Sequence, residues 1–83
     1  MKSRIKIMRR IGHNIKELRV QQQISQGELA ELLNVDRSLI SKWERGLAPI
    51  TADRMICLAE VLHVDISILY SDNCSQHQPK KDD

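Results

Sequence analysis

The sequence predicts an all-α fold, a compact bundle of five short helices. The chain has 83 residues, which suits one domain with a single core. Trp43 and Tyr70 are its only aromatic residues and there is no Phe, so the core has to be aliphatic. Apolar residues recur at helical spacing, and no strand signal or internal repeat occurs. These observations favour a helical bundle over a β fold, which usually relies on aromatic and β-branched residues.

The first helix is predicted over about residues 8–22. Its apolar stripe has helical spacing and consists of Met8, Ile11, Ile15 and Leu18. Residues 1–7 are basic, and they either prolong this helix or form a separate arm. We assign them to a basic N-terminal arm.

The second helix is predicted over 26–33, with Ser25 as its N-cap. Glu28 follows Ser25 by three residues, which matches a capping box. Asn34 comes directly after the helix and tolerates the left-handed conformation that a very short turn needs. We therefore expect a tight turn between the second and third helices.

The third helix is predicted over 36–45. Asp36 is a suitable N-cap, and Gly46 stands at the position where a helix ends in a left-handed residue. Ile40 and Trp43 mark the inward stripe, so Trp43 is interpreted as a core residue.

The fourth and fifth helices follow a connector whose Pro stops a helix. Thr51 caps the fourth helix, in which Met55, Leu58, Ala59 and Leu62 repeat at helical spacing. A shorter helix begins near Asp65 and ends near Tyr70. The helical domain is therefore predicted over 8–70, and the polar residues 71–83 are expected to form a disordered, flexible tail.

The charges are unevenly distributed along the chain. Residues 1–46 hold ten Lys and Arg against five acids, whereas residues 47–83 hold three against six. This polarity suggests one surface that faces a polyanion and another that faces away. On charge alone, chance clustering explains the asymmetry equally well.

Several classes of protein are excluded or disfavoured by the composition. The N-terminus lacks the apolar segment of a signal peptide, and no apolar run is long enough to span a membrane. The two cysteines have no metal-ligand spacing, so no metal and no cofactor is expected. No phosphate loop, catalytic triad or paired carboxylates point to an enzyme. We expect a cytoplasmic, non-enzymatic protein that needs no small-molecule ligand.

The outward face of the third helix is the clearest functional signal. It carries five hydrogen-bonding side chains and no acid, namely Arg37, Ser38, Ser41, Lys42 and Arg45. A helix face that only contacts solvent usually carries both acidic and basic residues. A face that binds an anion is expected to carry basic and hydrogen-bonding side chains without acids, as this one does. A short helix, a tight turn and a capped basic helix together form the helix-turn-helix arrangement, whose second helix lies in the DNA major groove. The N-terminus of its first helix, where Gln26 lies, offers free N–H groups to a phosphate.

The stretch ISQGELAELLNVDRSLISKWERG resembles the lambda repressor and Cro-like (XRE-type) helix-turn-helix family. The resemblance covers roughly residues 11–69 and implies a five-helix DNA-binding fold. Matching positions in and around the motif are Ser25, Gln26, Leu29, Ala30, Val35, Ile40, Ser41, Glu44 and Gly46. Downstream, the matching positions are Leu58, Ala59, Leu62, Val64 and Leu69.

The resemblance implies roles for several residues in and around the motif. The residues expected to read bases are Arg37, Ser38, Ser41 and Lys42. The residues expected to meet DNA phosphates are Ser25, Gln26 and Arg45. Arg19 and Glu44 match a pair that bridges the first and third helices in this family.

The sequence departs from the family pattern at two places. Gly27 occupies a position usually given to a better helix former, and its missing side chain leaves room for a phosphate. The connector GLAPIT also lacks the basic residues that some relatives use on phosphates.

We expect a transcription regulator, a repressor, that reads a palindromic operator in double-stranded DNA as a homodimer. The predicted dimer contact consists of Val61, Ile66, Ile68 and Tyr70, which are more apolar than a small monomer needs to expose. Alternatively, Ile66 and Tyr70 close the bottom of the monomer core. The alternative function is an antitoxin or another protein-interaction module on the same fold. An acidic outer face on the third helix would have favoured this alternative, and this face has no acid.

Overall fold

The computed structural model describes residues 2–71 of the chain, and the side chains of residues 4–71. It contains five helices, which are α1 (Lys2–Gln21), α2 (Gln26–Leu33), α3 (Arg37–Glu44), α4 (Ala52–Val61) and α5 (Ile66–Tyr70). No strand occurs within this range. The predicted all-α fold is therefore confirmed. The predicted tail over 71–83 lies outside the described residues, except for Ser71.

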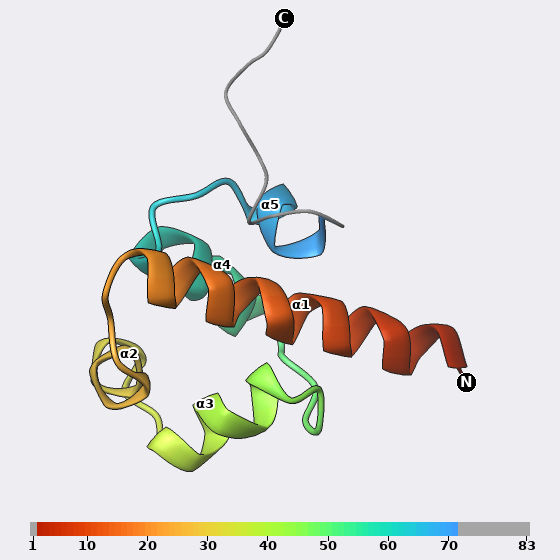
Figure 1. Ribbon diagram of the computed structural model, residues 1–83, viewed down its shortest axis with the longest axis horizontal. Helices are drawn as coiled ribbons and strands as arrows, with labels where there is room; N and C mark the ends of the chain where they lie inside the picture. The colour runs from red at the N-terminus through yellow and green to blue at the C-terminus, as the bar shows by residue number, and fades with distance from the viewer. Residues whose placement is uncertain (1, 72–83) are drawn as a thin grey trace, which may run out of the picture.

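The long helix α1 is the element on which the others pack. Figure 1 shows α3 on one side of α1 and α5 on the other, and α1 contacts both. The pairs α2–α3, α2–α4 and α4–α5 also pack together and close the bundle. The N-terminal half of α1 extends beyond the ends of α3 and α5 (Figure 1).

This extension decides between the two alternatives for residues 1–7. The helix α1 begins at Lys2 rather than near residue 8, so residues 2–7 prolong it and do not form a separate arm. The sequence KSRIKIMRR contains no Gly or Pro that would interrupt a helix before Gly12, and most of its residues are compatible with a helix.

Helix N-termini are capped mainly where the sequence predicts. The Glu28 N–H donates to Ser25 Oγ at 3.0 Å, and the Ser25 N–H donates to Glu28 Oε1 at 2.8 Å, so the capping box is confirmed. The Arg54 N–H donates to Thr51 Oγ1 at the start of α4. Asp36 holds the N-cap position of α3, but its side chain makes no capping hydrogen bond.

The short helix α5 is fixed at both ends by polar groups. At its N-terminus the Ser67 N–H donates to Asp65 Oδ1, and this backbone bond holds the pKa of the Asp65 carboxyl below its usual value. At its C-terminus the buried Asn14 side chain donates from Nδ2 to the carbonyl oxygens of Leu69 (2.9 Å) and Ser71 (2.7 Å). One amide in the middle of α1 therefore helps to hold α5, together with the packing of α5 on α1 and α4.

The C-termini of α1 to α4 share one geometry, whereas α5 ends in the extended residue Ser71. Left-handed residues follow four helices in the described part of the chain, and they are Gln23, Asn34, Gly46 and His63. After α3, the Gly46 N–H donates to the Trp43 carbonyl and the Leu47 N–H to the Lys42 carbonyl, the two bonds of a Schellman motif. The predicted roles of Asn34 and Gly46 are confirmed.

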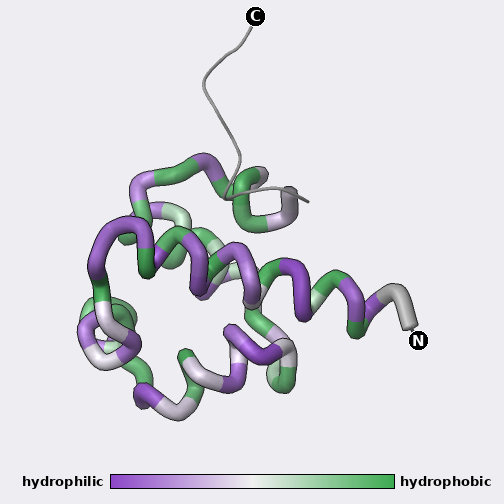
Figure 2. The backbone as a smooth tube through the Cα atoms, in the orientation of Figure 1, coloured by the Kyte–Doolittle hydropathy of each residue, from purple (hydrophilic) through white to green (hydrophobic). Residues whose placement is uncertain are grey.

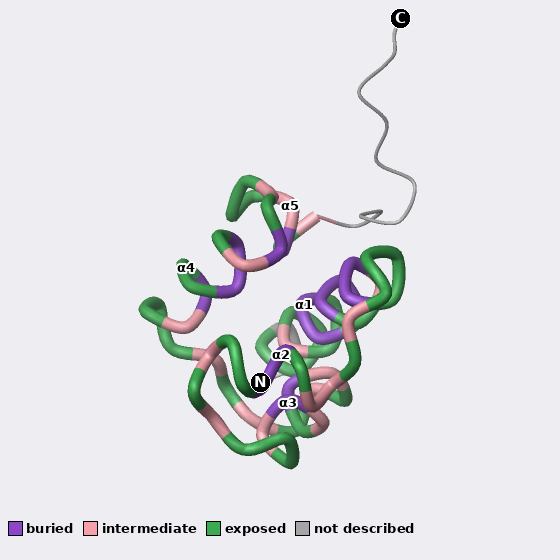
Figure 3. Tube along the Cα trace, turned by 90° about the vertical axis from the view of Figure 1, so that its left-hand side faces the viewer, coloured by how far each residue is buried: buried purple, intermediate pink, exposed green. Residues whose placement is uncertain are grey.

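The core is aliphatic around one indole ring. Its buried apolar residues come from α1 to α5 and are Ile11, Ile15, Leu18, Leu29, Ala30, Ile40, Trp43, Met55, Leu58, Ala59, Leu62 and Leu69. Trp43 is 2% exposed, so its predicted place in the core is confirmed. Figure 3 shows the buried segments on the helices and the mostly exposed connections between them. The turn after α1, which contains Gln22 and Gln23, is hydrophilic (Figure 2).

Candidate nucleic-acid interface

The helices α2 and α3 are joined by a turn of three residues, 34–36, and pack against each other. The Val35 N–H donates to the Ala30 carbonyl at 2.9 Å, which folds the turn back on α2. Val35 packs partly buried against the core, and this anchors the turn. The pair therefore forms a rigid unit with α3 on its outer side.

The helix α3 presents one face to the core and another to solvent. Ile40 and Trp43 are buried, while Arg37, Ser38 and Lys42 are exposed. Ser41 is half-buried, and Arg45, just after the last helical residue, is exposed. The five predicted contact residues recur at spacings of three or four and therefore share one side of the helix. That side carries three basic side chains and no acid.

A buried ion pair ties α3 to α1. Arg19 Nε donates to Glu44 Oε2 at 2.6 Å, and Arg19 Nη2 donates to Glu44 Oε1 at 3.1 Å. The side chains are 11% and 4% exposed, so this bidentate pair is shielded from water. Arg19 Nη1 also donates to the Ile24 carbonyl, which extends the contact to the turn before α2. The structure thus brings together the two residues that the resemblance pairs.

Gln26 joins the same cluster. Its Nε2 donates to Glu44 Oε1 at 3.0 Å, so the amide points towards α3. This contact ties the N-terminus of α2 to the C-terminus of α3. The other N–H of the amide remains chemically able to donate to a phosphate. Ser25, also predicted to meet a phosphate, is exposed and uses its hydroxyl oxygen to cap α2.

The backbone of α3 approaches α1 at Gly12. A Cβ atom added there would lie 2.0 Å from the Trp43 carbonyl oxygen and 2.9 Å from the Glu44 carbonyl carbon and oxygen. Only glycine permits this approach, because the obstructing atoms belong to the backbone. The depth and the angle of α3 are therefore set by Gly12 together with the Arg19–Glu44 pair.

Sequence reasoning missed one cation near α3. Arg54, in the first turn of α4, lines a polar cleft of about 550 Å³ together with Asn34, Asp36, Ser38 and Lys42. The sequence does carry a sign of this residue's importance, because Arg54 is the only Lys or Arg between Arg45 and Lys80. Its position after the connector does not reveal that it lies near α3, because this proximity depends on tertiary packing.

The four residues predicted to form a dimer contact differ in exposure. Ile66 and Tyr70 are 37% and 48% exposed, so they do not close the core. Val61 and Ile68 are half-buried and pack against the core instead. Ile56 on α4 is also exposed. The described surface of α4 and α5 therefore retains exposed apolar side chains. Of the four residues predicted to form the dimer contact, only Ile66 and Tyr70 are among them.

Two further kinds of site, a metal centre and a membrane-spanning helix, are absent from residues 2–71. No group of three or more His, Cys, Asp or Glu side chains is placed to hold a metal ion. No helix in that range is long and apolar enough to cross a membrane.

The fold and this face define a helix-turn-helix domain, in which α2 supports α3 and α3 presents its outer side. The family profile described as helix-turn-helix matches residues 15–69, and the chain belongs to this family. The family resemblance inferred from the motif is thereby confirmed. Among curated proteins, the chain is similar to the "Putative HTH-type transcriptional regulatory protein" of Methanothermobacter thermautotrophicus. The two are 35% identical over 57 residues, and this match spans 69% of the chain but only 18% of the relative.

Proposed function

We propose that the protein is a transcription regulator that binds double-stranded DNA in a sequence-specific manner through α3. Membership of the helix-turn-helix family and the similarity to a protein named as a transcriptional regulator both support this class. The observation that carries the proposal is the exposed side of α3. It holds Arg37, Lys42 and Arg45 without an acid, on a helix fixed by the buried Arg19–Glu44 pair.

In the proposed complex, α3 lies in the major groove. Arg37 at its N-terminus is suited to a bidentate contact with guanine, and Ser38, Ser41 and Lys42 reach neighbouring base edges. Arg45, at the far end of the face, meets the backbone. Ser25 and Gln26 approach a phosphate at the N-terminus of α2, where the helix dipole favours an anion.

The regulator is proposed to act in the cytoplasm as a repressor on a palindromic operator. A single recognition helix contacts only a few base pairs, too few to select one site in a genome. Two copies related by a two-fold axis read two half-sites about 34 Å apart. Repression is the simplest outcome, because a protein bound over a promoter excludes other proteins. We propose a binding function without an enzymatic step.

The test is site selection from a randomised DNA pool, followed by binding of two arginine variants to the selected site. Arg37→Ala should lose about 1–3 kcal/mol and relax the preference at one base pair. Arg45→Ala, the matched control on the same face, should weaken all sequences evenly and lower the slope of affinity against salt by about one. If Arg37→Ala binds the selected site as tightly as the parent does, the base-reading role of Arg37 is wrong. If the pool yields no preferred site, sequence-specific recognition is wrong.

A further inference from the structure

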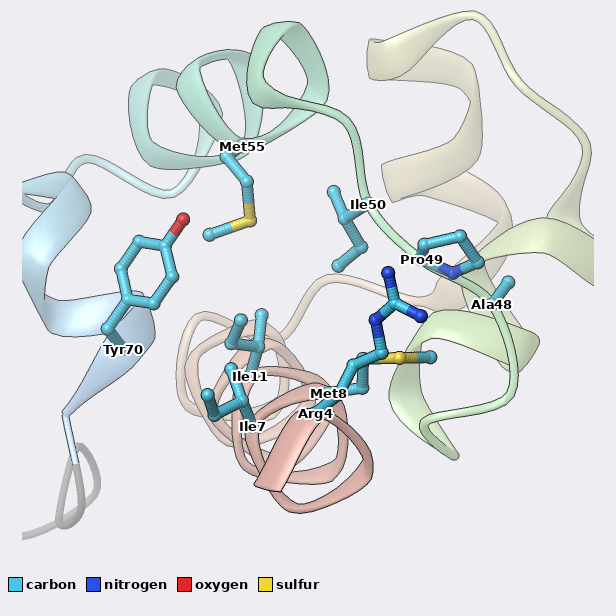
Figure 4. Close-up of a pocket in the computed structure, with 9 residues that line it drawn as sticks. All are labelled: Arg4, Ile7, Met8, Ile11, Ala48, Pro49, Ile50, Met55 and Tyr70. Atoms are coloured by element: carbon cyan, nitrogen blue, oxygen red, sulfur yellow. The ribbon is translucent and has the colours of Figure 1, made fainter. Parts of the chain in front are cut away.

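An apolar cavity of about 650 Å³ opens at the N-terminal half of α1, away from the residues of the α3 face. Its apolar walls include Ile7 and Ile11 from α1, Ile50 from the connector and Met55 from α4. Figure 4 shows these side chains around a common space. The volume lies within the range of pockets that enclose small-molecule ligands.

The cavity exists because α1 is longer than its partners can cover. Its floor is well packed, since Met55 is 2% and Ile11 is 7% exposed. One turn nearer the N-terminus, Ile7 is 44% exposed, so the other helices leave much of its side chain uncovered. Apolar surface of this kind gains free energy when an apolar group displaces its water.

The polar groups of the cavity are few and sit at different places. Among its lining residues only Arg4 and Tyr70 have side chains with nitrogen or oxygen atoms, and none is acidic. In Figure 4 the Arg4 guanidinium lies at the Pro49 end of the cavity. The Tyr70 hydroxyl points towards Met55 on another side (Figure 4). A ligand that fits this arrangement has an apolar body and one negative group.

We propose that this cavity binds a small amphiphilic carboxylate. The carboxylate accepts hydrogen bonds from the Arg4 guanidinium, a planar donor that matches its two oxygens. The apolar body lies along Ile7, Ile11 and Met55, and its far end reaches Tyr70. The proposal departs from the expectation, drawn from the sequence, that the protein binds no small molecule. It is independent of the proposed DNA contact, because none of the α3 face residues lines the cavity.

The test is a titration of the isotope-labelled protein with decanoate, followed by nuclear magnetic resonance below the micelle-forming concentration and without DNA. Saturable shifts are expected at the backbone amides around Ile7, Ile50 and Met55, with a dissociation constant on the order of a millimolar or lower. Decylammonium and 1-decanol, which share the chain but lack the negative charge, should bind more weakly by about fivefold or more.

Three variants locate the ligand. Arg4→Gln should weaken decanoate binding by about fivefold and leave 1-decanol binding unchanged. Lys6→Gln, which removes a positive charge from the same helix outside the cavity, should leave the binding of both unchanged. Ala48→Phe places a ring in the cavity and should abolish the shifts, and its amide spectrum shows whether the fold is retained.

The proposal is overturned if the shifts do not saturate, or if Arg4→Gln and Lys6→Gln weaken decanoate equally. It is also overturned if the amides of Ile7, Ile50 and Met55 shift on dilution of the protein alone, because a second copy of the chain then occupies the cavity. A shift on dilution that is confined to Tyr70 and its neighbours in α5 reports the proposed dimer contact instead. Equal binding of decanoate and decylammonium would show apolar adsorption without a carboxylate site. DNA binding by the parent protein is measured separately. If the protein binds DNA but gives one of these results with decanoate, the cavity proposal fails while the proposed function stands.

Discussion

At the scale of single residues, Gly12 and Gly27 both lie in helices, but replacing each with Ala is expected to change the free energy of unfolding in opposite directions. Gly12→Ala should lower the free energy of unfolding by about 3 kcal/mol, because the new methyl group meets the carbonyls of Trp43 and Glu44 and neither can move alone. Gly27→Ala should raise it by up to about 1 kcal/mol, since only Ser25 Oγ lies nearby, at 3.9 Å, and Ala is the better helix former.

Denaturant unfolding of the two variants measures this difference. Gly27→Ala is the matched control, since it makes the same chemical change in an open position. Equal effects of the two substitutions would mean that α1 and α3 do not approach as described. Gly27→Ala also tests DNA binding, because a phosphate that needs the space above Gly27 would be held less tightly.

The Arg19–Glu44 pair gives the second prediction at this scale. Glu44→Ala should destabilise the fold by about 3–5 kcal/mol, because it leaves the Arg19 charge buried without its partner and removes an acceptor for Gln26. An exposed pair would contribute only about 0–1 kcal/mol.

A double-mutant cycle with Arg19→Met and Glu44→Leu separates the pair from its surroundings. The double variant should be less destabilised than the sum of the two single variants, because no lone charge remains buried. Strict additivity would contradict the assignment of the pair as a coupled unit.

At the scale of helices, local signals predicted most of the fold. Apolar spacing gave the helices, and Ser25, Thr51, Asn34 and Gly46 marked their ends, because capping depends on a few neighbouring residues. The ends at Gln23 and His63 carry no such signal. There the chain has to turn for α2 and α5 to pack, and this tertiary requirement overrides the preference for Gly.

Contacts between distant elements could not be predicted from local pattern. Asn14 lies inside the apolar stripe of α1 and its partners lie in α5, so nothing near it in the sequence marks it as a helix cap. Gln26 was assigned to a phosphate, but its orientation towards Glu44 depends on how α2 and α3 pack. The Arg19–Glu44 contact was inferred through the family resemblance, with support from the place of Glu44 at the edge of the inward stripe.

Arg54 supplies a prediction for the element next to α3. The connector GLAPIT carries no cation, and Arg54 in the first turn of α4 lines the same cleft as Ser38 and Lys42. We propose that it meets the DNA backbone there. Arg54→Ala should then weaken binding evenly across DNA sequences and lower the salt slope by about one.

The matched control is Arg54→Lys, which keeps the charge and should retain the parent salt slope. Both variants leave the backbone N–H that donates to Thr51 in place, so the start of α4 is preserved. A salt slope for Arg54→Ala equal to that of the parent would show that Arg54 makes no phosphate contact.

At the scale of the whole molecule, charge and apolar surface occupy different parts of the chain. The described cations are concentrated in α1 and α3, whereas the C-terminal part of the chain is acidic. Ile66 and Tyr70 are exposed on α5, at an end of the chain that carries few cations. A contact through α5 would therefore leave α3 free to face DNA in both copies of a two-fold dimer.

The dimer is tested most sharply at Ile66. Ile66→Lys introduces a charge into the proposed contact at a position that is 37% exposed, so the monomer fold should persist while the dimer dissociates. Ile68→Lys is less informative, because Ile68 packs against the core and its loss would also disturb the monomer. Val20→Lys makes the same chemical change at an exposed position of α1 outside the proposed contact, and it should leave the dimer intact.

Sedimentation velocity at micromolar concentration, with and without a palindromic site, reads the outcome. The parent protein and Val20→Lys should sediment as dimers on DNA, and Ile66→Lys should bind half-sites as a monomer with weaker affinity for the palindrome. If the parent protein remains a monomer both alone and on its selected DNA, the proposed dimer is wrong, whereas the proposed recognition of bases by α3 is unaffected. On a palindrome, the contact between the two copies adds to the DNA-binding affinity of the second copy. The loss of affinity in Ile66→Lys should therefore be larger for a full palindrome than for a single half-site.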